Sequence, residues 1–208
     1  MKKYLVEFIG TFFLVLTIGM VVIASDVGHF APIAIGATLM VMIYAGGHVS
    51  GAHYNPAVTL AVWLRGRCAL SDVPGYLVAQ CLAAVAAAKL TLMFKGFPQV
   101  EPVTIVPYPG LLTEFIGTFA LAYVVLNVAT AKATANNSFY GLAIGFSITG
   151  LAFALGGYSI GAFNPAVAIG GFVIGLVPAS KLWIYFAGTL AAGAVAALAF
   201  KFINPEDK

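Results

Sequence analysis

The stretches SGAHYNPAVT (residues 50–59) and GAFNPAV (residues 161–167) decide the fold of this chain. Both contain the tripeptide Asn-Pro-Ala, which stands at Asn55, Pro56 and Ala57 in the first and at Asn164, Pro165 and Ala166 in the second. Asn is a strong N-cap, and Pro is favoured at the first helical position because its missing N–H would be unpaired there anyway. Each tripeptide therefore predicts a helix start, and each lies within an apolar part of the chain. A helix that begins inside a membrane presents free N–H groups and the positive end of its dipole at mid-depth.

The composition indicates a membrane protein. Of the 208 residues, 62% are hydrophobic and only 8% are charged, whereas soluble domains carry about 25% charge. This length has room for about six spans of roughly 20 residues and for no extramembrane domain. The net charge of +3 is too small to indicate a nucleic-acid partner. Cys68 and Cys81 follow no metal-binding spacing, which favours buried free thiols over a disulfide.

Six apolar runs predict six membrane-spanning helices, at residues 4–24, 33–50, 74–94, 110–131, 139–157 and 181–202. The first run follows Lys2 and Lys3, an arrangement that a cleavable signal peptide also has. Its length and the presence of Glu7 within it favour a membrane span instead.

The chain repeats itself once. The hexapeptide EFIGTF occurs at 7–12 and again at 114–119, a distance of 107 residues, and the two Asn-Pro-Ala tripeptides lie 109 residues apart. Each half then has three spans and one re-entrant half-helix, and an odd number of spans turns the second half upside down. We therefore expect an all-α membrane protein with six transmembrane helices and two re-entrant half-helices. It would be a single channel domain over residues 1–208, with inverted repeats at about 1–100 and 108–208.

The basic residues predict the orientation in the membrane. If the N-terminus is cytoplasmic, the inner loops and ends hold Lys2, Lys3, Arg65, Arg67, Lys132, Lys201 and Lys208. Only Lys95 and Lys181 then lie in outer loops, with Lys89 near the outer end of the third span. Both half-helices would run outward from mid-membrane in opposite directions, with their positive ends meeting at the centre. Two such ends make a polar, cation-repelling point on an apolar path, which favours a channel for uncharged solutes.

Glu7 and Glu114 are carboxylates inside predicted spans, where such groups are costly and usually functional. One interpretation is a proton or cation relay. The other is structural, because each carboxylate can accept hydrogen bonds from N–H groups of a re-entrant loop that would otherwise lack partners. Their identical setting in two inverted halves favours the second role, that of loop anchor.

The first tripeptide is preceded by His48 and His53. A metal site needs a third ligand, and the remaining histidine, His29, lies in a predicted outer loop, so we expect no metal and no cofactor. His53 is better explained as a tie that holds the loop. Unwound backbone before each tripeptide should expose carbonyl oxygens that accept hydrogen bonds from water. The residues concerned are Gly51, Ala52 and His53 in the first loop and Ile160, Gly161 and Ala162 in the second.

With SGAHYNPAVT, GAFNPAV and the two EFIGTF segments, nearly the whole chain resembles the major intrinsic protein family of aquaporins and aquaglyceroporins. The resemblance implies a homotetramer of six-helix bundles in a lipid bilayer, each subunit with its own pore. Asn55 and Asn164 would donate their side-chain amides to one water at the pore centre and help to interrupt proton conduction. Glycerol facilitators of the family typically carry an Asp soon after the second tripeptide and a Pro in the last span. Ala168 and the pair Tyr185-Phe186 stand there instead, as in the water-channel branch.

The chain departs from the family at Val167, where most members carry an Arg in the outer selectivity filter. Val stands there in some plant vacuolar members. The other filter residues implied by the resemblance are Ile35, Ala152 and Gly161, with Phe153 as the alternative to Ala152. With Ala152 in place, such a filter has no charge, no imidazole and no large ring, and it should be wider and less polar than a strict water filter.

We therefore expect a passive channel for water, and also for small neutral solutes, that excludes ions and protons. The alternative is a channel mainly for ammonia, glycerol, urea or hydrogen peroxide. An ion-coupled transporter would need unpaired midplane charges, and a structural or adhesion protein would not need two facing half-helices. No nucleophile–base pair or metal set indicates an enzyme. The expected location is a prokaryotic cytoplasmic membrane with both termini cytoplasmic, with a vacuolar membrane as the alternative.

Overall fold

The computed structural model of the chain describes residues 1–207, and the fold of this part is all helical. The α-helices are α1 (Lys2–Val22), α2 (Ala31–Ser50), α3 (Pro56–Leu64), α4 (Val73–Phe94), α5 (Pro107–Val125), α6 (Tyr140–Leu155), α7 (Pro165–Ile174) and α8 (Leu182–Ile203). Short helical turns are η1 (Gly28–Phe30), η2 (Leu126–Thr130), η3 (Lys132–Thr134), η4 (Gly156–Tyr158) and η5 (Ala179–Lys181). The turn η2 is π-helical and continues α5.

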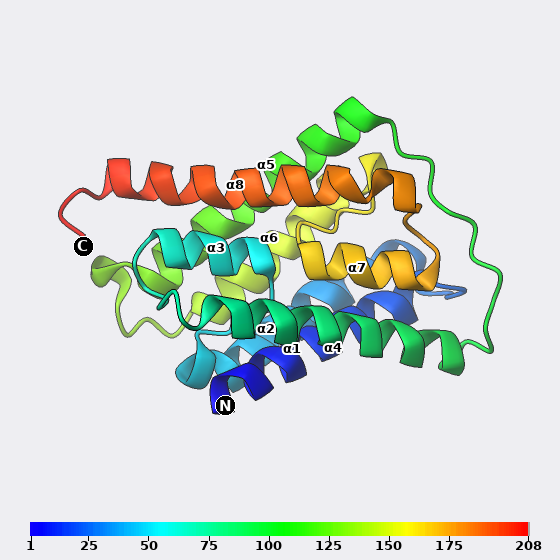
Figure 1. The fold of residues 1–208 in the computed structure, drawn as a ribbon, viewed down its shortest axis with the longest axis horizontal. Coiled ribbons are helices and arrows are strands. Elements are labelled where there is room, and N and C mark those ends of the chain that lie inside the picture. Colours follow the sequence, from blue (N-terminus) through cyan, green and yellow to red (C-terminus); the bar gives the residue numbers. More distant parts are fainter. Residues whose placement is uncertain (208) are drawn as a thin grey trace.

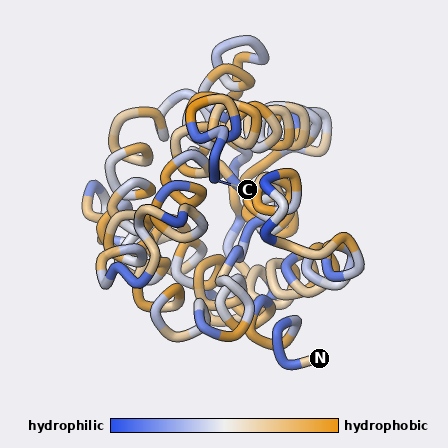
Figure 2. Tube along the Cα trace, turned by 90° about the vertical axis from the view of Figure 1, so that its left-hand side faces the viewer, coloured by the Kyte–Doolittle hydropathy of each residue, from blue (hydrophilic) through white to orange (hydrophobic). Residues whose placement is uncertain are grey.

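Six of these helices are long and apolar enough to cross a bilayer, which confirms the predicted all-α membrane fold and makes the chain an integral, multi-pass membrane protein. Their bounds differ from the predicted runs by three residues or fewer at most ends, because apolar composition does not show where a helix stops. In Figure 2, viewed from one end, the helices surround a central region. Both termini lie toward the same end of the bundle in Figure 1, hereafter the termini face.

The short helices α3 and α7 lie roughly end to end in the middle of the bundle (Figure 1). Each packs against a long helix of the other half, α3 on α8 and α7 on α4. The long helices pair in the same symmetric way, with α1 along α4 and α5 along α8. The two halves of the chain are thus interlocked through their half-helices.

Two glycines of the repeated hexapeptide allow the re-entrant loops to pack closely on α1 and α5. A Cβ on Gly10 would lie 2.2 Å from the Tyr54 ring, and one on Gly117 would lie 2.1 Å from the Phe163 ring. Tyr54 and Phe163 both have left-handed backbone, with φ of 49° and 48°. Each loop therefore has left-handed backbone at the equivalent position and packs an aromatic ring against the equivalent glycine.

At the termini face, Asp207 links three separate parts of the chain. Its carboxylate accepts hydrogen bonds from Arg65 Nη2 at 2.6 Å, from Arg67 Nη2 at 3.4 Å and from the backbone N–H of Lys132 at 2.8 Å. Arg65 ends α3, is buried, and lies over the Phe200 ring of α8 at 4.5 Å. The Lys132 N–H and the Arg65 guanidinium hold the pKa of Asp207 below its usual value.

We expect Asp207→Asn to lower the thermal unfolding midpoint in detergent at pH 7, because an amide keeps only one acceptor oxygen and no charge. The depressed native pKa means that the carboxylate stabilises the fold above its unfolded-state pKa, and that this is lost as pH falls through the native pKa. The midpoints of wild type and variant should therefore converge as the pH falls below the native pKa of Asp207. Glu206→Gln, at an exposed neighbouring position, is the control and should match wild type; an equal loss there would show a general charge effect.

Candidate functional site

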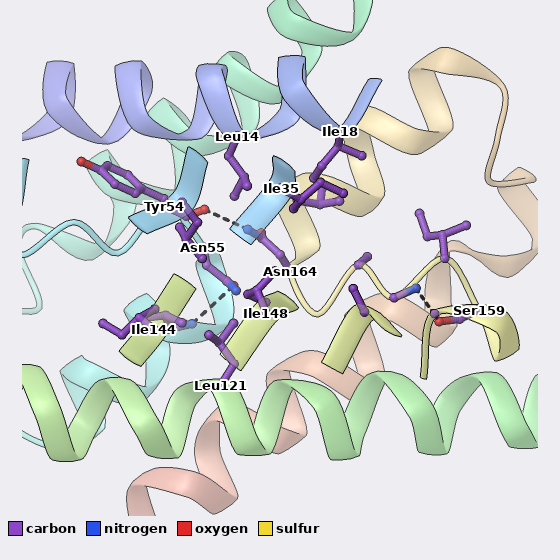
Figure 3. Close-up of a pocket in the computed structure, with 18 of the residues that line it drawn as sticks. Leu14, Ile18, Ile35, Tyr54, Asn55, Leu121, Ile144, Ile148, Ser159 and Asn164 are labelled. Atoms are coloured by element: carbon purple, nitrogen blue, oxygen red, sulfur yellow. Dashed lines mark hydrogen bonds between the residues drawn. The ribbon is translucent and has the colours of Figure 1, made fainter. Parts of the chain in front are cut away.

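A cavity of about 280 Å³ runs between the helices, with α3 and α7 beginning beside it (Figure 3). Its walls are mostly aliphatic. They include Leu14, Ile18, Val22, Ile35, Leu39, Ile43, Val58, Val103, Leu121, Val125, Ile144, Ile148, Val167 and Leu176. The polar residues that line it are His53, Tyr54, Asn55, Ser159 and Asn164. The cavity is therefore an apolar path with its polar groups on the two re-entrant segments.

Each Asn-Pro-Ala tripeptide starts a helix in the predicted way. Asn55 is the N-cap of α3, and its Oδ1 accepts from the backbone N–H of Ala57 at 2.8 Å and of Val58 at 3.4 Å. Asn164 is the N-cap of α7, and its Oδ1 accepts from the N–H of Ala166 at 2.9 Å. These contacts leave the side-chain amide nitrogens pointing away from their own helices.

Those amide nitrogens cross between the halves. Asn55 Nδ2 donates to the carbonyl of Phe163 at 2.8 Å, and Asn164 Nδ2 donates to the carbonyl of Tyr54 at 2.8 Å, as the dashed line between the latter pair in Figure 3 shows. Both asparagines are buried yet line the cavity. An amide has two N–H donors, so each asparagine keeps a second one after this contact.

Glu7, on α1, accepts hydrogen bonds from the first re-entrant loop. Its carboxylate takes the backbone N–H of His53 at 2.9 Å and of Tyr54 at 2.7 Å, the hydroxyl of Ser50 at 2.7 Å and Nε2 of Gln80 at 2.8 Å. The side chain is fully buried. This geometry provides what the anchoring interpretation needs, namely a charged acceptor for N–H groups that no helix satisfies.

Glu114, on α5, repeats this arrangement in the second half. It accepts from the N–H of Ala162 at 2.9 Å and of Phe163 at 2.7 Å, and from the Ser159 hydroxyl at 2.7 Å. Position 189, which lies 109 residues after Gln80, is Thr189, and its hydroxyl donates to the Tyr185 carbonyl instead. Within the described residues 1–207, the second carboxylate therefore accepts from three donors and has no counterpart of Gln80.

Two further N–H groups of the unwound loops are paired with serine hydroxyls. The N–H of Ala52 donates to Ser50 Oγ at 3.0 Å, and the N–H of Gly161 donates to Ser159 Oγ at 2.9 Å. Of the six residues predicted to offer carbonyls, Ala52, His53, Ile160, Gly161 and Ala162 line the central cavity. Gly51 lines instead a second cavity, of about 660 Å³, at the termini face.

His53 Nδ1 lies 3.1 Å from the Thr59 hydroxyl, and its ring packs on Tyr76 at 5.0 Å, so the imidazole joins the loop to α3 and α4. His48 lines the second cavity, and His29 belongs to η1 beyond the far end of α1. Within residues 1–207, no three His, Cys, Asp or Glu side chains gather as metal ligands.

The four residues of the predicted filter line one cavity. Ile35 comes from α2, Ala152 from α6, Gly161 from the second loop and Val167 from α7. Phe153, the alternative to Ala152, is 54% exposed and does not line this cavity. The filter role itself stays a prediction.

Comparison with known proteins now identifies the family. The profile of the major intrinsic protein family matches residues 1–200. Aquaporin NIP1-1 of Oryza sativa subsp. japonica is 39% identical over 217 residues, which cover 100% of this chain and 76% of that protein. Glycerol uptake facilitator protein-like 6 of Lactiplantibacillus plantarum is 33% identical, with 100% of both chains covered. The chain belongs to the major intrinsic protein family.

A solved structure agrees with this assignment at the level of the fold. The aquaglyceroporin from Plasmodium falciparum superposes with a TM-score of 0.81 at 22% identity, covering 98% of this chain and 97% of that one. This major intrinsic protein is accordingly a passive membrane channel and not an enzyme. Its place in the water-channel branch stays a prediction.

The sequence did not identify every residue of the cavity wall. Leu14, Leu39, Leu121, Ile144 and Ile148 line it from the long helices, which are apolar on all sides and so carry no periodic signal for a pore-facing side. Val103 and Leu176 line it from non-helical segments, where no periodicity exists to be read.

We expect Glu7→Gln and Glu114→Gln each to lower the free energy of unfolding by about 1–3 kcal/mol, because the new NH₂ group faces loop N–H donors in place of an acceptor. Thermal unfolding in detergent measures this. Glu101→Gln, at an exposed linker position, is the control. A variant that unfolds like wild type but loses a pH-dependent flux would favour the relay interpretation.

Proposed function

We propose that this channel passes water, and also small neutral solutes, and excludes ions and protons. The observation that carries the proposal is the crossed pair of asparagines, Asn55 and Asn164, at the point where α3 and α7 begin. Each has one N–H donor beyond its contact with the opposite loop. Two such donors can hold the oxygen of one water or hydroxyl at the centre of the cavity.

The place where α3 and α7 begin also accounts for the proposed exclusion of cations. The N-termini of α3 and α7 place the positive ends of two helix dipoles beside the cavity. A water whose oxygen accepts from both asparagines points its hydrogens outward and cannot pass a proton along a hydrogen-bonded chain. The aliphatic walls offer an ion no replacement for its hydration shell.

The hydrogen bonds within the two loops favour solutes that can donate hydrogen bonds to the loop carbonyls. Glu7, Glu114 and the hydroxyls of Ser50 and Ser159 take up the loop N–H groups. The backbone carbonyl oxygens of the two loops remain as hydrogen-bond acceptors for a solute in the cavity. With Val167 in place of an Arg, no side-chain donor stands at the predicted filter.

This filter also supports the alternative, in which the main solute is ammonia, glycerol, urea or hydrogen peroxide. Ile35, Ala152, Gly161 and Val167 form an uncharged set that suits a solute with an apolar side. A full-length relative is named a glycerol uptake facilitator-like protein, and other relatives are named aquaporins.

Assembly and orientation belong to the same proposal. We infer a homotetramer in which each subunit has its own pore. Both termini would lie on the cytoplasmic side of a prokaryotic cytoplasmic membrane or of a vacuolar membrane.

We expect proteoliposomes with purified wild-type protein to show faster osmotic shrinkage than empty vesicles by stopped-flow light scattering. Gradients of glycerol, urea and ammonia measure the neutral solutes, and planar bilayers should show no proton or sodium current. Solute flux without water flux would favour the alternative. A robust ionic current would overturn the proposed mechanism of exclusion.

We expect Val167→Arg to lower the ratio of glycerol to water permeability by about tenfold, because a guanidinium narrows the filter and supplies donors while removing apolar surface. The ratio is measured in matched proteoliposomes at equal protein content. Val167→Met is the control, since it adds length without charge or donors and should lower the ratio less. An unchanged or higher ratio in Val167→Arg would mean that Val167 is not part of the constriction.

A further inference from the structure

The linker between α4 and α5, residues 95–106, is fixed to the bundle along its length. It appears in Figure 1 as a long non-helical trace that runs from the end of α4 to the start of α5, at the face opposite the termini. Lys95 Nζ donates to the Ala24 carbonyl at 3.2 Å at one end. Near the other, the N–H of Val103 donates to the Leu176 carbonyl at 3.0 Å, and Ile105 is buried in the core.

The linker contributes one residue to the wall of the central cavity. Val103 is half-buried and lines the same cavity as Gly161 and Val167, whereas its neighbours Pro102 and Thr104 are exposed. Of linker residues 95–106, all of which the structure describes, Val103 alone lines this cavity. The linker thus adds a wall that none of the helices or re-entrant loops provides.

The neighbouring lining residues Val22 and Leu176 show at which end of the cavity Val103 lies. Val22 is the last residue of α1 and Leu176 comes just after α7, so both lie at the end of the cavity that faces away from the termini. The backbone N–H of Val103 donates a hydrogen bond to the Leu176 carbonyl, which places Val103 at that same end. We call these three cavity-lining residues, Val22, Val103 and Leu176, the apolar collar.

We propose that Val103 is a specificity-determining residue, a further wall of the constriction that acts on a solute as it enters or leaves. This inference rests on the proposed channel function. The side chains of the collar have no hydrogen-bond donors or acceptors. A solute must therefore lose hydration water there before it reaches the carbonyls of the second loop. A solute with apolar surface regains part of the free energy of dehydration by contact with the collar, whereas water does not. The backbone bond to Leu176 holds the linker in place, so the side chain at 103 sets the width and polarity there.

An exchange of two neighbouring residues tests the proposal. Val103→Thr keeps the shape of the side chain and adds a hydroxyl, and Thr104→Val makes the reverse change at the exposed neighbour. We expect Val103→Thr to lower the glycerol-to-water permeability ratio by about threefold to tenfold, and Thr104→Val to leave the ratio at the wild-type value. Equal ratios in Val103→Thr and wild type would overturn the proposal.

A thiol experiment tests the position of the side chain without relying on selectivity. In a Cys68→Ser, Cys81→Ser background, Val103→Cys and Thr104→Cys are treated in proteoliposomes with a membrane-impermeant cationic methanethiosulfonate, and labelling is quantified by mass spectrometry. We expect labelled Val103→Cys to lose most of its water flux and labelled Thr104→Cys to keep it. Full labelling of Val103→Cys with unchanged flux, or no labelling there while Thr104→Cys reacts, would overturn the proposal.

The wild-type fluxes separate this inference from the function on which it rests. Wild-type protein without any water or solute flux overturns the proposed function, and the role of Val103 with it. Normal wild-type flux with an unblocked Val103→Cys overturns the role of Val103 alone.

Discussion

The fold depends on two buried carboxylates that accept the hydrogen bonds of backbone with no helical partner. A half-helix that begins inside a membrane needs an unwound segment before it, and in hydrocarbon each unpaired N–H of that segment costs several kcal/mol. Glu7 takes the N–H groups of His53 and Tyr54, and Glu114 takes those of Ala162 and Phe163. Because these donors are satisfied from the side of α1 and α5, the loop carbonyls remain for the channel.

The two carboxylates differ in their hydrogen-bond partners. Glu7 has an additional donor in Gln80 of α4, which also bonds Thr59 of α3 at 3.0 Å, so the first loop is braced by three helices. Glu114 has no such partner, and Thr189 bonds within α8. The two loops are joined to each other by Asn55, which donates to the Phe163 carbonyl, and by Asn164, which donates to the Tyr54 carbonyl. These two contacts tie the second loop, which carries Gly161, to the better supported first loop.

The sequence predicted the parts of the fold that repeat. EFIGTF and Asn-Pro-Ala recur at nearly equal distances because each half must solve the same problem, and the helix starts at Pro56 and Pro165 follow from capping alone. It could not predict Val103, Leu176 or the ties of Asp207, since these segments have no periodicity and tertiary contacts place them. The choice of Ala152 over Phe153 was open because α6 is apolar all round, so only packing on α2 fixes which side faces the cavity.

A channel built in this way separates two tasks along its length. Under the proposed function, charge is opposed at the centre, where two helix dipoles and two amide donors meet, so the predicted filter at Val167 needs no Arg to exclude cations. Selection among neutral solutes is then left to aliphatic walls, which distinguish molecules by width and by how much water each must lose. Such walls include Ile35, Val103, Ala152 and Val167, and none of these four residues makes a hydrogen bond to Glu7 or Glu114. The solute range of this fold can therefore change by substitution at these positions without disturbing the hydrogen bonds on which the half-helices depend.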